Sequence, residues 1–396
     1  MADIIIRPLI GSAASDALLH QWYELFAANR GEAFPGFPMP GFEAFAARRR
    51  RAAGELDPGP GRAWAAWDGE LLLGVGTAVY LERDFPEYAV PSVDVHPDHR
   101  RRGVGTALLR ALLADASAEG RGMLVQEQVR IGSPGEAWVR ATGFTEVLRN
   151  RWQMLDVPAT DPARWDVPVP EGFRLAQWVG AAPEPLVSAF AAARNAIGDA
   201  PTGESGYEAP EWTVARVREE EARSAAAGES MHHAVAVHEA TGAVAALTGV
   251  LVMPPRVDLV WQRDTAVAGD FRGRGLGRVV KAAMMRALLA EHPGLGRVVT
   301  STAAHNAAMI RVNERIGYAP YAEIGVFEAS VAQLEAVLGT AAANLPGPRR
   351  EAPADETGRR PGQGESAQPE SAQGESAQGE SAQDESAQDE SALSIS

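Results

Sequence analysis

One short pattern occurs twice in this chain of 396 residues, at positions 93–106 (VDVHPDHRRRGVGT) and 265–278 (TAVAGDFRGRGLGR). In both copies an arginine is followed three residues later by a glycine, and two residues after that by a second glycine. The copies lie 172 residues apart, which is about the length of one domain. Each follows an apolar stretch typical of a strand and precedes an amphipathic stretch typical of a helix. The repeat predicts two strand–turn–helix units, and therefore a duplicated domain.

A glycine-rich turn between a strand and a helix suits the binding of a diphosphate. The first N–H groups of a helix have no partners within it, and the helix dipole adds positive potential there. Glycine allows close approach of the anion and tolerates a positive φ. A single copy could equally well be a turn that only connects a strand to a helix. Two copies in one register favour two phosphate-binding sites, or one working site and one relic. The patterns of other phosphate loops, GxxxxGK[ST] and GxGxxG, are absent.

The order of predicted elements also repeats along the chain. Residues 1–156 form the first predicted domain, 173–340 the second, and the four prolines of 157–172 indicate a linker between them. In the first domain we expect helices at 13–29, 42–53, up to 118 and at 134–141, with strands near 62–68, 71–80, 88–96, 121–130 and 144–156. In the second we expect helices at 183–196, 210–227, 275–291 and 306–316, with strands at 173–177, 231–239, 243–253, 257–267 and 297–302, and further strands or a short helix to about 338.

The C-terminal stretch 341–396 has a different composition. Glu-Ser-Ala recurs every five residues from Glu365 to Glu390, and bulky apolar side chains are nearly absent. Such a segment cannot bury enough surface to offset its ordering entropy, so we expect a disordered acidic tail. The tail carries a net charge of −7 of the formal −15 of the chain. The remaining excess of negative charge argues against binding to nucleic acid or anionic membranes.

Three absences limit the chemistry and the location. The chain has no cysteine, which excludes disulfides, thiolate catalysis and an acyl-cysteine intermediate. The histidine pair His232-His233 and His238 show no metal-ligand spacing with other donors, so we expect no metal. The N-terminus lacks the basic and apolar regions of a signal peptide, and no apolar run is long enough to span a membrane. These features predict a cytoplasmic protein.

The spacing Arg-x-x-Gly-x-Gly after a strand resembles the acetyl-CoA motif of the GNAT (GCN5-related) N-acetyltransferase superfamily. The segment 306–318, NAAMIRVNERIGY, resembles the second signature of that family, and the first domain keeps its end at Gly143-Phe144. The resemblance covers nearly all of residues 1–340 as two tandem domains, an arrangement similar to mycothiol synthase and other actinobacterial acetyltransferases. It implies an α/β fold in which each domain has a mixed sheet.

The resemblance implies that the loops and the strands before them bind acetyl-CoA. Loop amides would hold the pyrophosphate, and the strand backbone would hold the pantetheine arm and place an N–H at the thioester oxygen, as an oxyanion donor. In the first domain the implied residues are Val93, Val95, Arg101, Arg102, Gly103, Val104, Gly105 and Thr106. In the second they are Thr265, Val267, Gly273, Arg274, Gly275, Leu276, Gly277, Arg278 and Asn306.

The family commonly uses a general base and a tyrosine acid, and in each domain this chain departs from that pair. The position of the usual tyrosine acid holds Asn313 in the second domain and Val139 in the first, and the position of the base holds Ser301 and Glu127. Asn313 is a candidate for a hydrogen bond to the coenzyme, or else a helix polar residue. Asp264 and Asp258 lie on or near a central strand, where a carboxylate can accept a proton or make an ion pair. Glu127 is a candidate base if the first domain is active.

These features predict an N-acetyltransferase that moves an acetyl group from acetyl-CoA to a primary amine of a small molecule or peptide by direct attack. The second domain, which has both signatures, is the expected working site. A non-catalytic acyl-CoA-binding module is the alternative from another class, motivated by the missing tyrosine, and mycothiol synthase is a third. The sequence does not identify the acceptor, the oligomeric state or the role of the tail.

Overall fold

The computed structural model describes residues 4–50, 61–81, 84–199, 210–253 and 256–339. We call residues 4–156 the first half and residues 157–339 the second half. The strands are β1 (Ile5–Pro8), β2 (Gly61–Asp68), β3 (Leu71–Tyr80), β4 (Tyr88–Val95), β5 (Met123–Arg130), β6 (Thr145–Asp156), β7 (Phe173–Val179), β8 (Ser230–His238), β9 (Val244–Met253), β10 (Arg256–Val267), β11 (Arg297–Ala303) and β12 (Ala319–Ser330). The α-helices are α1 (Asp16–Ala33), α2 (Phe42–Arg50), α3 (Val104–Ala118), α4 (Pro134–Ala141), α5 (Glu184–Arg194), α6 (Val214–Ala226), α7 (Leu276–Glu291), α8 (Ala307–Ile316) and α9 (Val331–Leu338).

Within the described residues, the twelve strands form one continuous mixed sheet in the order β1-β2-β3-β4-β5-β12-β6-β11-β10-β9-β8-β7. Most neighbours are antiparallel, but β4 runs parallel to β5 and β10 runs parallel to β11. Helices cover both faces: α5 and α7 both pack against β9, for example. This explains why β9 (VAALTGVLVM) is buried at every position but its last and shows no polar alternation. The α/β fold with a mixed sheet, expected from the family resemblance, is confirmed.

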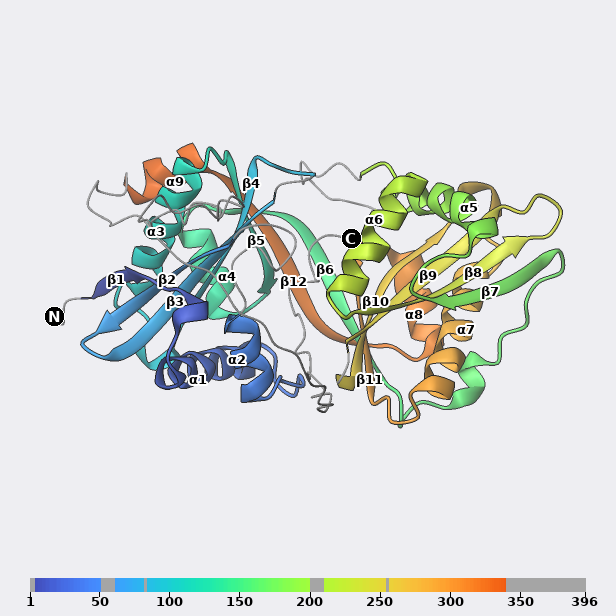
Figure 1. The fold of residues 1–396 in the computed structure, drawn as a ribbon, viewed down its shortest axis with the longest axis horizontal. Helices are drawn as coiled ribbons and strands as arrows, with labels where there is room; N and C mark the ends of the chain where they lie inside the picture. Colours follow the sequence, from blue (N-terminus) through green and yellow to red (C-terminus); the bar gives the residue numbers. More distant parts are fainter. Residues whose placement is uncertain (1–3, 51–60, 82–83, 200–209, 254–255, 340–396) are drawn as a thin grey trace, which may run out of the picture.

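The two halves exchange their last strands. Strand β12, from the second half, lies between β5 and β6, and β6, from the first half, lies between β12 and β11. Figure 1 shows both strands at the junction of the two lobes. Because a strand interior to a sheet needs partners on both edges, each half depends on the other to complete its sheet. The predicted domains are consecutive in sequence but interlocked in space.

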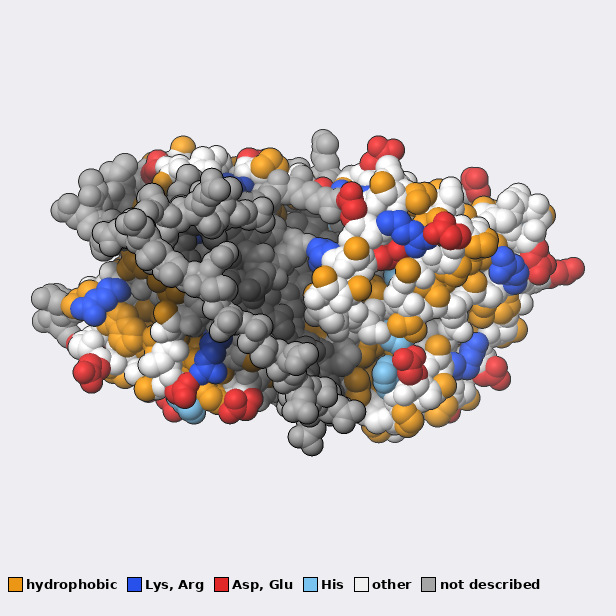
Figure 2. Space-filling model, viewed as in Figure 1, with side chains coloured by type: hydrophobic (Ala, Val, Ile, Leu, Met, Phe, Trp, Pro, Cys, Tyr) orange, Lys and Arg blue, Asp and Glu red, His pale blue; other side chains and the backbone are white. Residues whose placement is uncertain are grey.

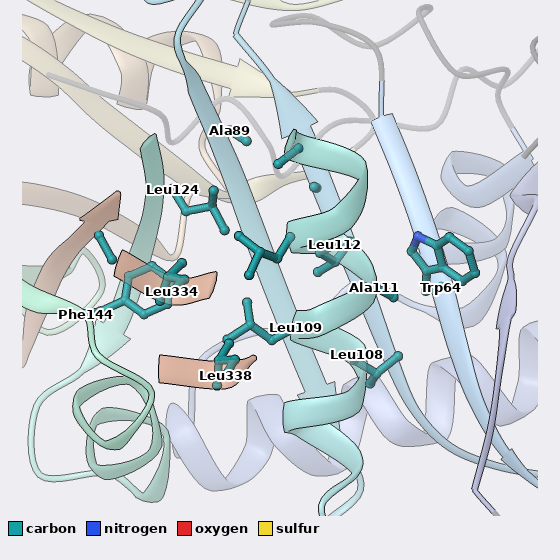
Figure 3. Packing of buried hydrophobic residues seen from close by; sticks show 14 of the residues in the cluster. Trp64, Ala89, Leu108, Leu109, Ala111, Leu112, Leu124, Phe144, Leu334 and Leu338 are labelled. Atoms are coloured by element: carbon teal, nitrogen blue, oxygen red, sulfur yellow. The ribbon is translucent and has the colours of Figure 1, made fainter. Parts of the chain in front are cut away.

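Helix α9 extends this exchange. It follows β12 and packs on the first half, beside α3, with Leu334 and Leu338 facing Leu109 and Phe144 (Figure 3). Arg110 Nε donates to the carbonyl oxygen of Leu338 at 2.8 Å. The end of the described chain therefore belongs to the core of the first half (orange helix among the blue and teal elements in Figure 1).

The proline-rich segment 157–172 is mostly exposed but is anchored to the second half by two buried side chains, Val157 and Trp165. It contains a short 3-10 helix, η3 (Pro162–Trp165), whose Trp165 is buried in the core of the second half. The Trp165 indole N–H donates to the carbonyl of Ile316 at 3.0 Å. The segment contains no α-helix and no strand, as its prolines predict. The prolines did not indicate the buried contact of Trp165.

A second contact between the halves is aromatic. Phe34 and Phe37, which follow α1, pack against Trp152 on β6 and Trp261 on β10, with Phe34 stacked on Trp152 at a centroid distance of 5.2 Å. Arg297, at the start of β11, donates through Nη1 to the carbonyl of Gly36 at 2.7 Å. The segment after α1 is thus held by the second half.

On the face drawn in Figure 2, basic and acidic side chains of the described residues are interspersed with apolar ones rather than gathered by sign. Among the described residues, no helix combines the length and the apolar character that crossing a membrane requires. The predicted acidic tail, 341–396, lies outside the described residues.

Candidate active site

The two glycine-rich turns have the same backbone form. Gly103 and Gly275 are the N-cap residues of α3 and α7, with φ of 85° and 77°, in the left-handed region that favours glycine. Residues 101–103 and 273–275 are exposed, whereas Val104 and Leu276, the first residues of the two helices, are buried. Each turn therefore presents backbone at an open helix N-terminus, as anion binding requires.

The arginine that opens each turn braces it. Arg100 Nε donates to the carbonyl of Val95 at 3.3 Å, and Arg272 Nε donates to the carbonyl of Val267 at 3.1 Å. Both bonds join a residue to the one five positions earlier, at the end of the preceding strand. The repeated arginine thus has a shared structural role, which the sequence motif alone did not reveal.

The parallel strands part next to each turn. In the second half β10 pairs with β11 only from Leu259 to Gln262, and the last residues of β10 leave that ladder. In the first half β4 pairs with β5 only at Tyr88 and Ala89. Thr265 and Val267, and likewise Val93 and Val95, therefore lie on a strand edge with no partner in β11 or β5. Such an edge offers backbone N–H and C=O groups to an extended ligand.

A β-bulge lies where β10 leaves β11. Gln262 pairs with Val250 and Thr265 with Thr248, so β10 has one residue more than β9 between these pairs. The Thr248 hydroxyl lies 2.6 Å from Gln262 Nε2, which donates to it, and 2.7 Å from the Thr265 hydroxyl. One buried threonine therefore holds the residues on both sides of the bulge.

Asp264 lies within this bulge and is paired with an arginine. Arg194, at the end of α5, donates to Asp264 Oδ2 at 3.2 Å and to Glu220 on α6 at 2.8 Å. The Asp264 side chain is 15% exposed, and its Oδ1 atom has no hydrogen-bond partner among the described residues. The Arg194 guanidinium also stacks on Trp212, 3.3 Å from the ring centroid. A carboxylate oxygen is thus buried, oriented and unused beside the opening of the strands.

His233 lies near this cluster. It is buried on β8, stacked on Trp178 and edge-on to Phe190. Burial, with a further contribution from the charge of Arg194, lowers the pKa of His233 to about 3, so its ring is neutral at physiological pH. Its Nδ1 atom and the Trp178 Nε1 atom are buried without a hydrogen-bond partner among the described residues. Together with Asp264 they place three unsatisfied polar atoms on the α5 side of the sheet.

The two asparagines of the second signature are both engaged in the fold. Asn306 is the N-cap of α8, where its side chain accepts the N–H of Met309 at 3.1 Å. Asn313 is completely buried and donates through Nδ2 to Gln153 at 2.9 Å and to Thr302 at 3.3 Å. Asn306 thus caps the helix, and Asn313 is a polar helix residue that lies in the core.

The first half has its own polar residues at the equivalent place. Glu127 is half-buried and sits in a bulge of β5, next to Gln128, which has a positive φ of 55°. Asp94, which sequence reasoning missed, lies on β4; burial raises its pKa, and Arg49 and Arg30 oppose that shift. The indole of Trp138 on α4 lies against the turn, 3.3 Å from where a Cβ on Gly105 would be. At Gly277, the equivalent glycine, a Cβ would meet only Val267, at 3.5 Å.

The comparisons with known proteins agree with this architecture. Residues 19–129 match the model of the acetyltransferase (GNAT) family, and residues 261–326 match that of the acetyltransferase (GNAT) domain. The first match contains the turn at Gly103, and the second contains the turn at Gly275. Fold and turns thus define a tandem GNAT protein. The chain belongs to the GNAT family of acetyltransferases and is an acyltransferase enzyme.

One curated relative and two solved structures match over two thirds or more of this chain. The chain is 28% identical over 279 residues to a mycothiol acetyltransferase from Nocardia farcinica. The matched region covers 67% of this chain and 81% of that relative. It is similar to a tandem GNAT protein from the clavulanic acid biosynthesis pathway, with a TM-score of 0.66, 25% identity and coverage of 83% of this chain and 99% of that one. A GCN5-related N-acetyltransferase from Sphaerobacter thermophilus shares the fold, with a TM-score of 0.62, 16% identity and coverage of 83% and 96%.

Proposed function

We propose that the second half holds the working site, which binds acetyl-CoA and passes its acetyl group to a primary amine of a small molecule. One observation carries this proposal: the bulge that presents Asp264 lies where β10 leaves β11, and the same strand then leads to the exposed turn at Gly275. A phosphate site, an open strand edge and a buried carboxylate therefore follow one another along a single strand and turn. That order matches an extended thioester ligand whose reactive end meets the carboxylate.

The residues divide the work as follows. The backbone amides of Gly273 to Arg278 hold the diphosphate at the N-terminus of α7. The free edge of β10 at Thr265 and Val267 holds the pantetheine arm. Acetyl-CoA supplies an activated acetyl group as its thioester. Asp264, held by Arg194, accepts the proton of the acceptor amine, directly or through a water molecule, and so frees the nitrogen lone pair for attack.

In this proposal Asn313 does not act as an acid; it holds β6 and β11 in place beside α8. Its amide nitrogen is used by Gln153 and Thr302, although its Oδ1 atom has no hydrogen-bond partner among the described residues. An amide cannot donate a proton as a phenol does. Departure of the coenzyme thiol therefore takes its proton from water or from another group at the site.

The first half is proposed to support the second rather than to carry the reaction. Its turn has the same backbone form, but the indole of Trp138 lies beside Gly105. Glu127 remains the candidate base there. Because the chain is 28% identical to a mycothiol acetyltransferase, an amine precursor of mycothiol is the first acceptor to test.

Release of free thiol from acetyl-CoA, measured with a panel of primary amines that includes this precursor, tests the proposal. We expect amine-dependent thiol release well above the rate without amine. Tight acetyl-CoA binding with no turnover on any amine would favour the alternative, a module that binds acyl-CoA without catalysis; the engaged Asn313 is the observation that supports that alternative.

A further inference from the structure

We propose that His232, Glu291 and His292 bind a divalent transition metal ion, with zinc the best fit, at the end of α7 remote from the glycine-rich turn. His232 lies on β8, Glu291 is the last residue of α7, and His292 is its C-cap. The two histidines are sixty positions apart in sequence, so ligand spacing gave no sign of the cluster. The fold brings one donor atom of each residue within 4.8 Å of the others.

The distances in the cluster suit a shared central ion. His232 Nδ1 lies 3.6 Å from one carboxylate oxygen of Glu291, and His292 Nε2 lies 3.8 Å from the other. Both distances exceed those of hydrogen bonds. Donor atoms around a tetrahedral zinc ion are about 3.3 Å apart, given zinc–ligand distances near 2.0–2.1 Å. The three donor atoms, which all lie within 4.8 Å of one another, therefore need to move closer together by only a short distance to reach that spacing.

The surroundings favour the protonation states that a metal requires. The Ser230 hydroxyl lies 3.2 Å from His232 Nε2, and a hydrogen bond donated by that nitrogen leaves the Nδ1 lone pair facing Glu291. His292 Nε2 is buried without a hydrogen-bond partner among the described residues. A ligand atom that is buried and unsatisfied is what an ion would use.

The chemistry of the donors selects the class of metal. Two imidazoles and one carboxylate suit zinc and its neighbours, whereas calcium and magnesium prefer oxygen ligands only. The carboxylate side chain is 50% exposed, so an ion can enter from solvent and keep water as a fourth ligand.

The position of the cluster indicates a structural role. Helix α7 has 16 residues and is therefore about 24 Å long, so the cluster is far from the turn at Gly275. An ion there ties the C-terminus of α7 to β8 and fixes the helix whose N-terminus is the proposed phosphate site. Metal binding is thus expected to stabilise the fold and to leave the acetyl-CoA site free.

Zinc binding by chelator-treated, tag-free protein tests the proposal, with calorimetry for stoichiometry and affinity and thermal unfolding for stability. The unmodified protein is expected to bind one zinc ion per chain and to unfold at a higher temperature with zinc. His292→Ala and Glu291→Gln, which change side chains that reach the surface, should each weaken binding by more than tenfold. His238→Ala, on the same strand β8 but outside the cluster, should bind like the unmodified protein.

Two results would overturn the assignment. One is the absence of stoichiometric zinc binding by the unmodified protein. The other is equal zinc affinity in His292→Ala, Glu291→Gln and the His238→Ala control, which would mean adventitious surface binding only. Cobalt substitution adds a spectroscopic check, because a site with imidazole ligands and low coordination number gives visible absorption that His292→Ala should lose.

Discussion

Asn313 and Gln153 are joined by a buried hydrogen bond that links the two halves of the chain. Asn313 Nδ2, on α8, donates to Gln153 Oε1, on β6, at 2.9 Å, and both side chains are completely buried. Strand β6 comes from the first half but lies in the sheet of the second. The position at which the family resemblance implied a tyrosine acid is thus occupied by a residue that holds the exchanged strand.

Replacing Asn313 by alanine should therefore lower stability without changing the acid–base behaviour of the reaction. The change leaves the Gln153 carbonyl unsatisfied in the core, at a cost of about 1–3 kcal/mol. Urea unfolding measures the loss, and the pH profile of acetyl transfer measures the chemistry. Normal stability together with the loss of one limb of that profile would show instead that Asn313 takes part in proton transfer.

Strand exchange predicts that neither half folds alone. Fragment 1–156 lacks β12, the partner of β5 and β6, and fragment 157–340 lacks β6, the partner of β11. Expressed separately, each should be aggregated or unfolded by circular dichroism; expressed together, they should purify as one complex. Two stable monomeric fragments would contradict the exchanged topology.

Asp264→Asn should lower kcat/KM for the amine by roughly 10²–10⁴-fold, the usual contribution of general base catalysis, with the affinity for acetyl-CoA unchanged. Asp258→Asn is a matched control, because Asp258 lies on the same strand but is exposed. Steady-state kinetics and calorimetry of both variants separate the roles. Equal activity in Asp264→Asn and Asp258→Asn would remove Asp264 from the mechanism.

Lys281, the only lysine of the chain, should make stability depend on pH in the alkaline range. It is 1% exposed, and burial lowers its pKa from 10.5 to about 7. Between these values the unfolded chain binds more protons than the folded one, so the free energy of unfolding rises with pH by about 1.4 kcal/mol per unit. Urea unfolding at about pH 7 and about pH 9 should show this rise.

Lys281→Met keeps the length of the side chain and removes the charge. Its stability should exceed that of the unmodified protein near pH 7, and the alkaline rise should disappear. An identical pH dependence in the variant would show that Lys281 is not the group responsible.

The secondary structure was largely predictable because most of its signals are local. The helix predicted at 134–141 is α4, and the strand predicted at 71–80 is β3. Capping by Ser133 and the apolar run of β3 are properties of neighbouring residues, so sequence spacing carries them. Helix α1 is an exception: it runs from Asp16 to Ala33 rather than over 13–29, and the side chain of Ser15 caps its N-terminus.

Long-range features were not predictable in the same way. The apolar patterns of β6 and β12 fit either half of the sheet, so the exchange of strands leaves no mark in the sequence. Each turn was recognisable partly because its capping residue, Gly103 or Gly275, has a positive φ that favours glycine. The partner of Asp264 was not recognisable, because Arg194 lies seventy residues away. The bulge that presents Asp264 depends on Thr248 in another strand.

The most direct test of the account is the binding of acetyl-CoA to Gly275→Glu, with Gly103→Glu as the matched variant of the first turn. No neighbouring atom lies within 4 Å of a Cβ at either position, so the added side chain has room. Its carboxylate repels the proposed diphosphate, and a residue other than glycine is also strained at the positive φ of the turn. We predict by calorimetry that Gly275→Glu loses at least 100-fold in affinity at the site that supports turnover, and that Gly103→Glu keeps that affinity and the activity. Unchanged binding and turnover in Gly275→Glu would contradict the central claim that the second turn holds the acetyl donor.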